Sequence, residues 1–257
     1  MKMSNSAQRI ALVTHPPAIY LGLLLLIIPP SSKSQELDTY TIDYRAKAGI
    51  VTATARRSLS KKERNSYQLL NTLNVALAGQ SVAEIIERSE VVLLDDQTLV
   101  PNSYSKEQFG FRDNLESITY NWNQSAATII NSDQFTQINL EKGTFDQLSH
   151  QIAMREKFTR GGEQFSYNVI DDFKLKEYQY SVIGREEIKT PLGDFHSIKI
   201  ERTQPRDDKR SIVFWLSTEW AGVLLRMDQV INGTIELTLE IQDGFVNGRP
   251  ITGQIED

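Results

Sequence analysis

The stretch Asn232-Gly-Thr-Ile-Glu-Leu-Thr-Leu-Glu-Ile241 decides the fold of this chain. From Ile235 to Ile241 every second residue is apolar, and the residues between are threonine or glutamate. A period of two is typical of a β-strand with one buried face and one wet face. Asn232-Gly233 between two alternating runs indicates a two-residue hairpin turn. We therefore predict an antiparallel hairpin at this point.

The same period recurs along the chain from Asp38 to Asp243. Its apolar faces comprise Tyr40, Ile42 and Tyr44; Tyr67, Leu69, Leu73, Val75 and Leu77; Ile118, Tyr120 and Trp122; Phe165, Tyr167 and Val169; and His196, Ile198 and Ile200. The breaks between the runs are short and rich in Asp, Asn and Gly, which favour turns. Short connections cannot make parallel crossovers, so the pattern predicts a largely antiparallel sheet.

One segment departs from the β pattern. Thr144-Phe-Asp-Gln147 fits a capping box with Thr144 as the N-cap, and a helix is predicted from there to about Phe158, before Gly161-Gly162. Its apolar residues fall on two sides: Phe145, Leu148 and Ile152 on one, Met154 and Phe158 on the other. A helix that is apolar on two sides is enclosed. The predicted fold is mainly β: a large curved antiparallel sheet, a spiral or open barrel, wrapped around a single α-helix.

Residues 1–34 have the pattern of a secretory signal peptide. Lys2 and Arg9 precede an 11-residue apolar core, Ala18–Ile28, and Pro29-Pro30 follows it. A membrane span needs about 20 apolar residues, so an uncleaved anchor is the less favoured alternative. We predict cleavage after Ser34, a single β-rich domain over residues 35–257, and a periplasmic location.

The charge balance limits the partners of this domain. Residues 1–34 carry three basic residues and no acidic residue, which leaves 25 basic and 33 acidic residues, a net charge of −8. A general nucleic-acid binder is excluded, because its affinity depends on phosphate contacts by basic residues. One basic run could contact lipopolysaccharide, phospholipid heads or cell-wall polymer, or could be a solvated hairpin end. It consists of Arg56, Arg57, Lys61, Lys62 and Arg64.

Chemistry-bearing motifs are scarce. The chain has no Cys and three His, which excludes disulfides and thiolate zinc sites and leaves little for other metal chemistry. No phosphate-binding, dinucleotide-binding or hydrolase motif occurs, so we expect no cofactor and no metal. Asp146, Ser149 and His150 share one face of the predicted helix, but a nucleophile also needs an oxyanion hole, which the sequence does not indicate. We expect a protein that is not an enzyme.

Six large aromatic residues are either core residues or the lining of a ligand site. Tyr and Trp on a concave sheet offer flat apolar area with a polar edge, which suits an acyl chain, a glycan or a peptide. The candidates are Tyr120, Trp122, Tyr178, Tyr180, Trp215 and Trp220.

The order of several short blocks resembles the bacterial domain-of-unknown-function family 3108. The blocks are Tyr40-Thr-Ile-Asp-Tyr44, Gly49-Ile-Val51, Val100-Pro-Asn-Ser-Tyr104, Gly143-Thr-Phe-Asp-Gln-Leu-Ser149, Thr190-Pro-Leu-Gly-Asp-Phe-His-Ser-Ile-Lys-Ile200, Trp215-Leu216 and Arg226-Met227. The resemblance covers about residues 40–239. It implies an exported protein without an assigned activity, similar to spiral or open-barrel β folds that enclose a helix, as in periplasmic lipoprotein carriers.

These patterns lead to one main functional hypothesis. We expect a soluble, exported, non-enzymatic protein that binds an apolar or amphipathic ligand, such as a lipid, or an envelope protein in a β-sheet concavity. The alternatives are a structural scaffold of the cell envelope without a small-molecule ligand and, third, an envelope hydrolase.

Overall fold

A computed structural model describes residues 36–49, 51–110, 113–204 and 210–254. The signal peptide expected at residues 1–34 and its cleavage site lie outside these ranges.

The described chain forms one sheet of 16 strands with a single helix between its ninth and tenth strands in sequence. The first part of the sheet comprises β1 (Tyr40–Ala48), β2 (Val51–Lys61), β3 (Ser66–Leu77), β4 (Gln80–Leu93), β5 (Leu99–Gly110), β6 (Asn114–Asn121), β7 (Ala126–Asn131) and β8 (Gln134–Asn139). The second part comprises β9 (Thr144–Asp146), α1 (Ser149–Thr159), β10 (Gln164–Asp171), β11 (Lys174–Thr190), β12 (Gly193–Gln204), β13 (Arg210–Ser217), β14 (Leu224–Ile231), β15 (Thr234–Val246) and β16 (Arg249–Pro250).

The strand order makes the sheet a pair of meanders joined along one seam. It runs from β8 back to β1, continues with β15, and then runs from β14 back to β9. The seam is the antiparallel pair of β1 with β15, in which Tyr40 lies opposite Val246. Neighbouring strands are antiparallel except β9 and β10, which are parallel. The end strands β8 and β9 are not paired with each other in the described chain, so the sheet is open.

The hairpin predicted at Asn232-Gly233 is confirmed. Asn232 and Gly233 have φ angles of 50° and 80° and connect β14 to β15, with Ile231 opposite Thr234. Positive φ at both central residues is the requirement of a type I′ turn, which matches the twist of the flanking strands.

The helix begins later than its sequence predicts. Thr144–Asp146 forms β9 against Asn168–Ile170, and α1 starts at Ser149 with Leu148 as the N-cap. The prediction of Thr144 as N-cap is therefore wrong. Asp146 supplies the capping instead, because its Oδ1 atom accepts the backbone N–H groups of Leu148 and Ser149 at 2.9 and 2.8 Å. The predicted end near Phe158 lies one residue from the observed end at Thr159.

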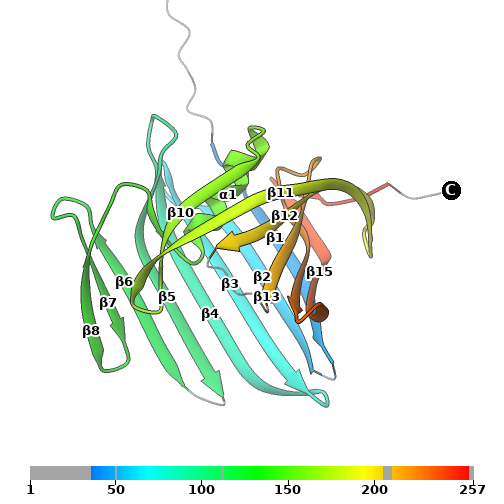
Figure 1. The fold of residues 1–257 in the computed structure, drawn as a ribbon, viewed down its shortest axis with the longest axis horizontal. Coiled ribbons are helices and arrows are strands. Elements are labelled where there is room, and N and C mark those ends of the chain that lie inside the picture. Colours follow the sequence, from blue (N-terminus) through cyan, green and yellow to red (C-terminus); the bar gives the residue numbers. More distant parts are fainter. Residues whose placement is uncertain (1–35, 50, 111–112, 205–209, 255–257) are drawn as a thin grey trace, which may run out of the picture. The chain divides into compact units, whose positions relative to one another are not determined.

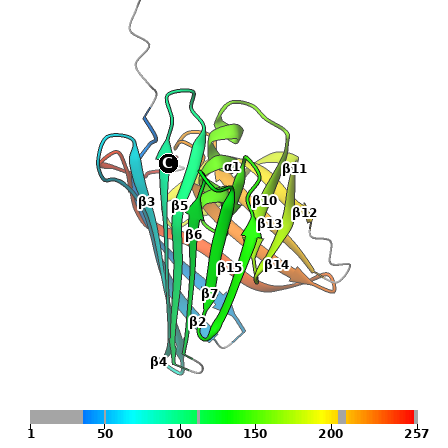
Figure 2. The same ribbon diagram turned by 90° about the vertical axis from the view of Figure 1, so that its left-hand side faces the viewer.

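The helix lies near one end of the strands, between β1–β8 and β10–β13, while β2–β5 continue well beyond it (Figures 1 and 2). Ile152, Met154 and Phe158 of α1 are buried in a core that also contains residues of both meanders, among them Leu69 and Ile200. This arrangement confirms the predicted fold: an open, curved, antiparallel sheet around one helix. Its concave face is packed beside α1 and uncovered farther along the strands.

Candidate functional site in the sheet concavity

Just beyond the helix, the residues on the concave face change from apolar to polar. Five polar residues lie side by side across β2–β6, one from each strand, and we call them the polar row: Arg57, Asn71, Glu87, Lys106 and Glu116. On the helix side of this row the next residues inward, such as Leu59, Leu69 and Ile118, belong to the packed core. The polar row therefore marks the boundary of that core.

On the other side of the polar row the concave face is apolar over β2–β4 and continues so over β1, β15 and β14, whereas on β5 and β6 it is polar at Gln108 and Asn114. We call this surface the apolar floor: Ala46, Ala53, Leu73, Val75, Ala83, Ile85, Met227 and Leu239, which are joined by cross-strand pairing. Most of these side chains are only half-buried. Their neighbours in sequence on the opposite face, such as Thr52, Thr54 and Asn74, are polar and exposed. An apolar surface left uncovered in this way is a feature of interaction sites.

Hydrogen bonds and charges hold the polar row in place. Glu87 accepts hydrogen bonds from Asn71 Nδ2 at 2.9 Å and from the hydroxyl of Tyr104 at 3.0 Å. Burial raises the pKa of Glu116 above its ordinary value, the charges of Glu87 and Asp171 add to this, and Lys106 opposes it. The row thus carries cationic and anionic groups, of which Arg57 and Glu87 lie on strands that continue into the apolar floor.

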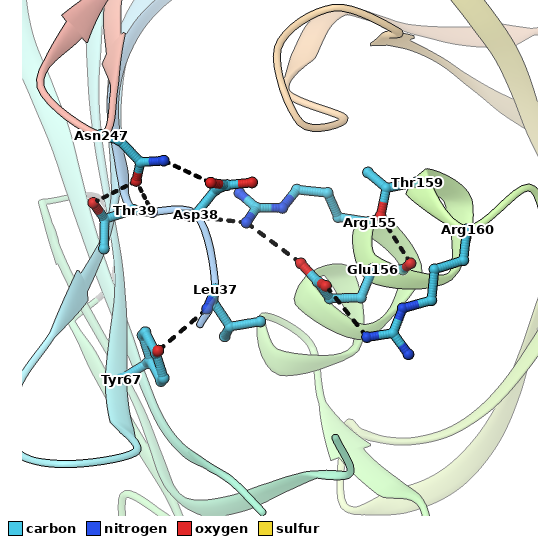
Figure 3. A network of polar contacts seen from close by, with 9 residues as sticks. All are labelled: Leu37, Asp38, Thr39, Tyr67, Arg155, Glu156, Thr159, Arg160 and Asn247. Atoms are coloured by element: carbon cyan, nitrogen blue, oxygen red, sulfur yellow. Dashed lines mark hydrogen bonds and ion pairs between the residues drawn. The ribbon is translucent and has the colours of Figure 1, made fainter. Parts of the chain in front are cut away.

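Arg57, in the polar row, also connects the sheet to the helix. Its Nη1 atom donates to Gln151 Oε1 of α1 at 2.6 Å. Arg155, one turn further along α1, donates from Nη2 to the carbonyl oxygen of Asp38 at 2.8 Å and lies 3.6 Å from Glu156 Oε1 (Figure 3). Its guanidinium also stacks 4.8 Å from the ring centroid of Tyr40.

The same view shows how the segment before β1 is held. Asp38 Oδ1 accepts from Asn247 Nδ2 at 2.6 Å, and the hydroxyl of Tyr67 accepts from the Leu37 N–H at 3.2 Å (Figure 3). These contacts bring the start of the described chain, its C-terminal turn and α1 together at one end of the concavity.

The segment that opens the helix contains a fully buried carboxylate. Asp146 Oδ2 accepts from Ser89 Oγ and Ser149 Oγ, both at 2.8 Å, in addition to the two backbone bonds to Oδ1. Burial raises the pKa of Asp146 above its ordinary value, and its hydrogen bonds oppose the shift. These bonds join β4, β9 and α1, so this carboxylate positions the helix on the sheet.

His150 is hydrogen-bonded to neither the serine hydroxyl nor the aspartate carboxylate that a catalytic triad requires. Its Nδ1 atom donates to the Asp146 carbonyl oxygen at 3.1 Å, and its Nε2 atom therefore accepts from the Tyr180 hydroxyl at 2.9 Å. Burial, with help from the charges of Arg57 and Arg202, lowers the pKa of His150 to about 4, so the ring is neutral at pH 7. Ser149 bonds directly to Asp146, without the histidine between them that a Ser-His-Asp relay uses.

The six aromatic candidates fall in separate places. Tyr178 and Tyr180 are buried beside His150, with ring centroids 5.3 and 6.0 Å from its imidazole, and the Tyr178 hydroxyl donates to Asp171. Tyr120 and Trp122 stack at 5.8 Å near the β6–β7 turn, where Trp122 Nε1 donates to the Pro101 carbonyl. Neither pair belongs to the polar row or the apolar floor.

The two remaining candidates lie away from the concavity's centre. Trp215 alternates with Phe214 and Leu216, which face α1, so its ring is on the outer face of the sheet, between the cations of Lys199 and Arg226. Trp220 lies in the β13–β14 turn, and its Nε1 atom donates to the Thr252 carbonyl at 3.2 Å.

The basic run does not form one surface. Arg56 faces outward and binds Asp43 in a bidentate pair at 2.6 and 2.7 Å, whereas Arg57 faces the concavity. Lys61 pairs with Glu36 at 2.6 Å, and Lys62 and Arg64 are exposed at the β2–β3 turn. Alternation along a strand separates neighbouring residues, which the linear run of charges does not reveal.

Gln151 and Arg155 were not among the residues predicted from the sequence. The sequence did contain a signal for Arg155. A helix that is apolar on two sides is enclosed, so a cation near its centre is expected to be buried. Within the described ranges, no group of three or more His, Asp or Glu residues could hold a metal ion. No helix in the same part of the chain is long and apolar enough to cross a membrane.

The fold places this protein in the class of β proteins in which an open sheet encloses one helix. The chain matches the family model "Protein of unknown function (DUF3108)" over residues 39–240, and it therefore belongs to that family. The resemblance expected over about residues 40–239 is confirmed. Among curated proteins no significant match was found.

A likeness to a solved structure supports the fold. A β-barrel-like protein of the domain of unknown function DUF1849 from Brucella abortus is similar with a TM-score of 0.54 and 10% identity, over 82% of this chain and 99% of that chain. A likeness at this identity shows the fold alone. A protein from Bacteroides fragilis that is described as exported, with a YmcC-like fold, has a TM-score of 0.33 and 11% identity, over 84% and 97% of the two chains. The latter score is too low to carry an argument.

Proposed function

We propose that this chain is an exported, non-enzymatic protein of the bacterial cell envelope, located in the periplasm, that binds an amphipathic lipid on the concave face of its sheet. The observation that carries the proposal is the meeting of the polar row with the apolar floor. An amphipathic molecule presents the same two surfaces, a polar head joined to an apolar chain.

The apolar floor supplies the driving force for such binding. Each methylene removed from water contributes about 0.8 kcal/mol, so a chain of several methylenes laid on half-buried Leu73, Val75 and Ile85 gains a useful fraction of its transfer free energy. β2–β5 extend beyond α1 (Figure 1), so the helix does not cover the part of the concave face on which the apolar floor lies. Export is supported by the leader pattern in residues 1–34.

A pair of substitutions on one strand tests the ligand site. Val75→Asp places a charge on the apolar floor, whereas Asn74→Asp places the same charge on the exposed opposite face. We expect Val75→Asp to weaken binding of an uncharged fluorescent acyl probe by about tenfold or more, because a carboxylate is poorly solvated under an alkyl chain. Asn74→Asp should bind as the wild type does.

Two further measurements complete the test. Native mass spectrometry of protein purified from the periplasm should show a lipid adduct, and N-terminal sequencing of that protein should begin near Gln35. An adduct-free protein that also ignores the acyl probe would remove the ligand proposal. Protein found only in the cytoplasm with its leader intact would remove the export proposal.

A scaffold without a small-molecule ligand is the second candidate. It is favoured by the packing of α1 against β1, β2, β13 and β14, where the cavity has a volume of only about 40 Å³. In-cell cross-linking that captures one dominant envelope protein, together with an empty protein in native mass spectrometry, would support this candidate over the first.

The non-enzymatic part of the proposal has its own support and test. Ser149 and His150 both bond to Asp146 and not to each other, an arrangement that positions the helix. We expect Ser149→Ala to retain the phenotype that the wild-type gene restores in a deletion strain. Loss of that phenotype in a variant with an unchanged melting temperature would favour a hydrolase.

A further inference from the structure

A small, partly enclosed cavity lies between α1 and the strands β1, β2, β13 and β14. Its volume is about 40 Å³. Apolar side chains such as Ile42, Phe214 and Leu216 form part of its wall, and the polar side chains of Arg57, Gln151 and Arg155 also line it. A water molecule needs roughly 10–15 Å³ of such space, so the cavity has room for an oxygen-bearing group or a few waters.

Within the described residues, three buried donor nitrogens of the two arginines that line the cavity have no hydrogen-bond partner. They are Arg57 Nε, Arg155 Nε and Arg155 Nη1. Arg155 is only 5% exposed, so bulk water does not satisfy its donors. Guanidinium groups stay charged in proteins, and a buried charged donor without an acceptor is costly.

Protein carboxylates do not balance the two cations. In the described chain no carboxylate lies within salt-bridge distance of Arg57, and the carboxylate nearest Arg155 is Glu156, at 3.6 Å. Glu156 is shared, because its Oε2 atom lies 3.9 Å from Arg160 Nη2. The charges of Arg57 and Arg155 both oppose the rise in the pKa of Tyr44 that its burial causes. The Tyr44 hydroxyl donates to the Leu224 carbonyl oxygen at 3.0 Å. The cavity therefore carries an excess of positive charge and of donors.

We infer that this cavity is a binding site for an oxyanion, a carboxylate or phosphate group held between Arg57 and Arg155. Planar guanidinium groups suit such anions, because their N–H bonds match the spacing of two oxygens. Arg57 is also the end of the polar row, and two residues along β2 from it Ala55 lies opposite Leu73 of the apolar floor. The oxyanion is either a free ion or the head of an amphipathic lipid, and only the second source rests on the proposed function.

Side-chain NMR of the isotope-labelled full domain tests the site directly. Inorganic phosphate and short-chain phosphatidylglycerol below its micelle concentration are titrated separately at constant ionic strength, while the Arg Nε–H signals are followed. We expect the signals of Arg57 and Arg155 to shift and saturate with at least one of the two probes.

Matched variants separate the site from general charge. Arg57→Gln and Arg155→Gln should each weaken binding by about tenfold or more, since each removes charge-assisted hydrogen bonds. Arg56→Gln, the neighbouring residue on the outer face, and Arg160→Gln, at the exposed end of α1, should bind as the wild type does. If Arg155→Gln does not fold, Arg57→Gln with its Arg56→Gln control carries the test.

Each outcome has a defined meaning. Saturation by phosphate identifies a free-oxyanion site, and saturation by phosphatidylglycerol alone identifies the lipid head as the source. No shift with either probe, or equal binding by Arg57→Gln, would overturn the inference and leave water as the partner of these donors. The uncharged acyl probe reports the apolar floor independently, so either proposal can fail while the other stands.

Discussion

At the scale of single residues, the helix is held by ionisable groups whose burial opposes their charge. His150 is neutral because burial lowers its pKa to about 4, and Asp146 has a raised pKa for the same reason. These two shifts act on stability in opposite directions as the pH falls. The histidine shift destabilises the fold in acid, because the unfolded state binds a proton that the folded state does not accept.

We expect His150→Gln to flatten the acid side of the stability profile. In the wild type the contribution of His150 to the free energy of unfolding is fully present above its unfolded pKa of 6.5. This contribution, up to about 3 kcal/mol, is lost as the pH falls toward about 4. Urea unfolding at pH 7.5 and 4.5 measures the difference. Asp146 is common to both proteins, so its opposite contribution largely cancels. An equal loss of stability in wild type and variant would contradict this assignment.

Residue pattern alone could not locate the site. Alternation correctly grouped Tyr178 with Tyr180, but it could not show that Trp215 faces outward, because a period of two leaves open which face is concave. Likewise Arg56 and Arg57 are adjacent in sequence and lie on opposite faces. The polar row is formed by one residue from each of five strands, so it exists only once the register is known.

At the scale of elements, local signals predicted the hairpins well and the helix start less well. Asn232-Gly233 has the conformation that its sequence requires. The Thr144–Gln147 segment satisfies the capping pattern, yet pairing of β9 with β10 takes Thr144–Asp146 into the sheet. A tertiary contact thus overrides a local propensity, and Asp146 takes over the capping two residues before Leu148.

The β14–β15 hairpin provides a test of backbone conformation without side-chain contacts. Gly233 has φ +80°, and a Cβ there would meet nothing within 4 Å. Gly233→Ala therefore changes only the free energy of holding the backbone at a positive φ. We expect a loss of about 1 kcal/mol in the free energy of unfolding, measured by urea denaturation. Gly184→Ala is the matched control, because Gly184 is equally uncrowded and lacks a positive φ. Equal effects of the two substitutions would contradict the explanation.

At the scale of the whole described domain, an open sheet leaves two end strands. The outer face near one of them, β8, carries exposed apolar residues: Phe135 is 68% exposed, Leu115 57% and Ile130 44%. Ile130 and Phe135 are directly paired across β7 and β8. An apolar, unpaired strand edge favours contact between molecules.

We expect Phe135→Lys to reduce concentration-dependent self-association, because a lysine at an edge strand opposes pairing with a second chain. Light scattering over a concentration series measures the effect, and the melting temperature should change little since the side chain is exposed. Thr136→Lys, on the other face of the same strand, is the control for added charge. Unchanged scattering by Phe135→Lys would show that this edge is already protected.

The β1–β15 seam has a consequence for the order in which the chain folds. Strands β1–β8 pair with their sequence neighbours, so this meander can form as soon as residues 40–139 have emerged on the side of the membrane where the protein folds. The other edge of β1 must wait for Thr238–Val246, close to the end of the chain. Until the last strands emerge, the half-formed sheet therefore presents a central strand as an unprotected edge, and a chaperone that covers extended segments would act in that interval.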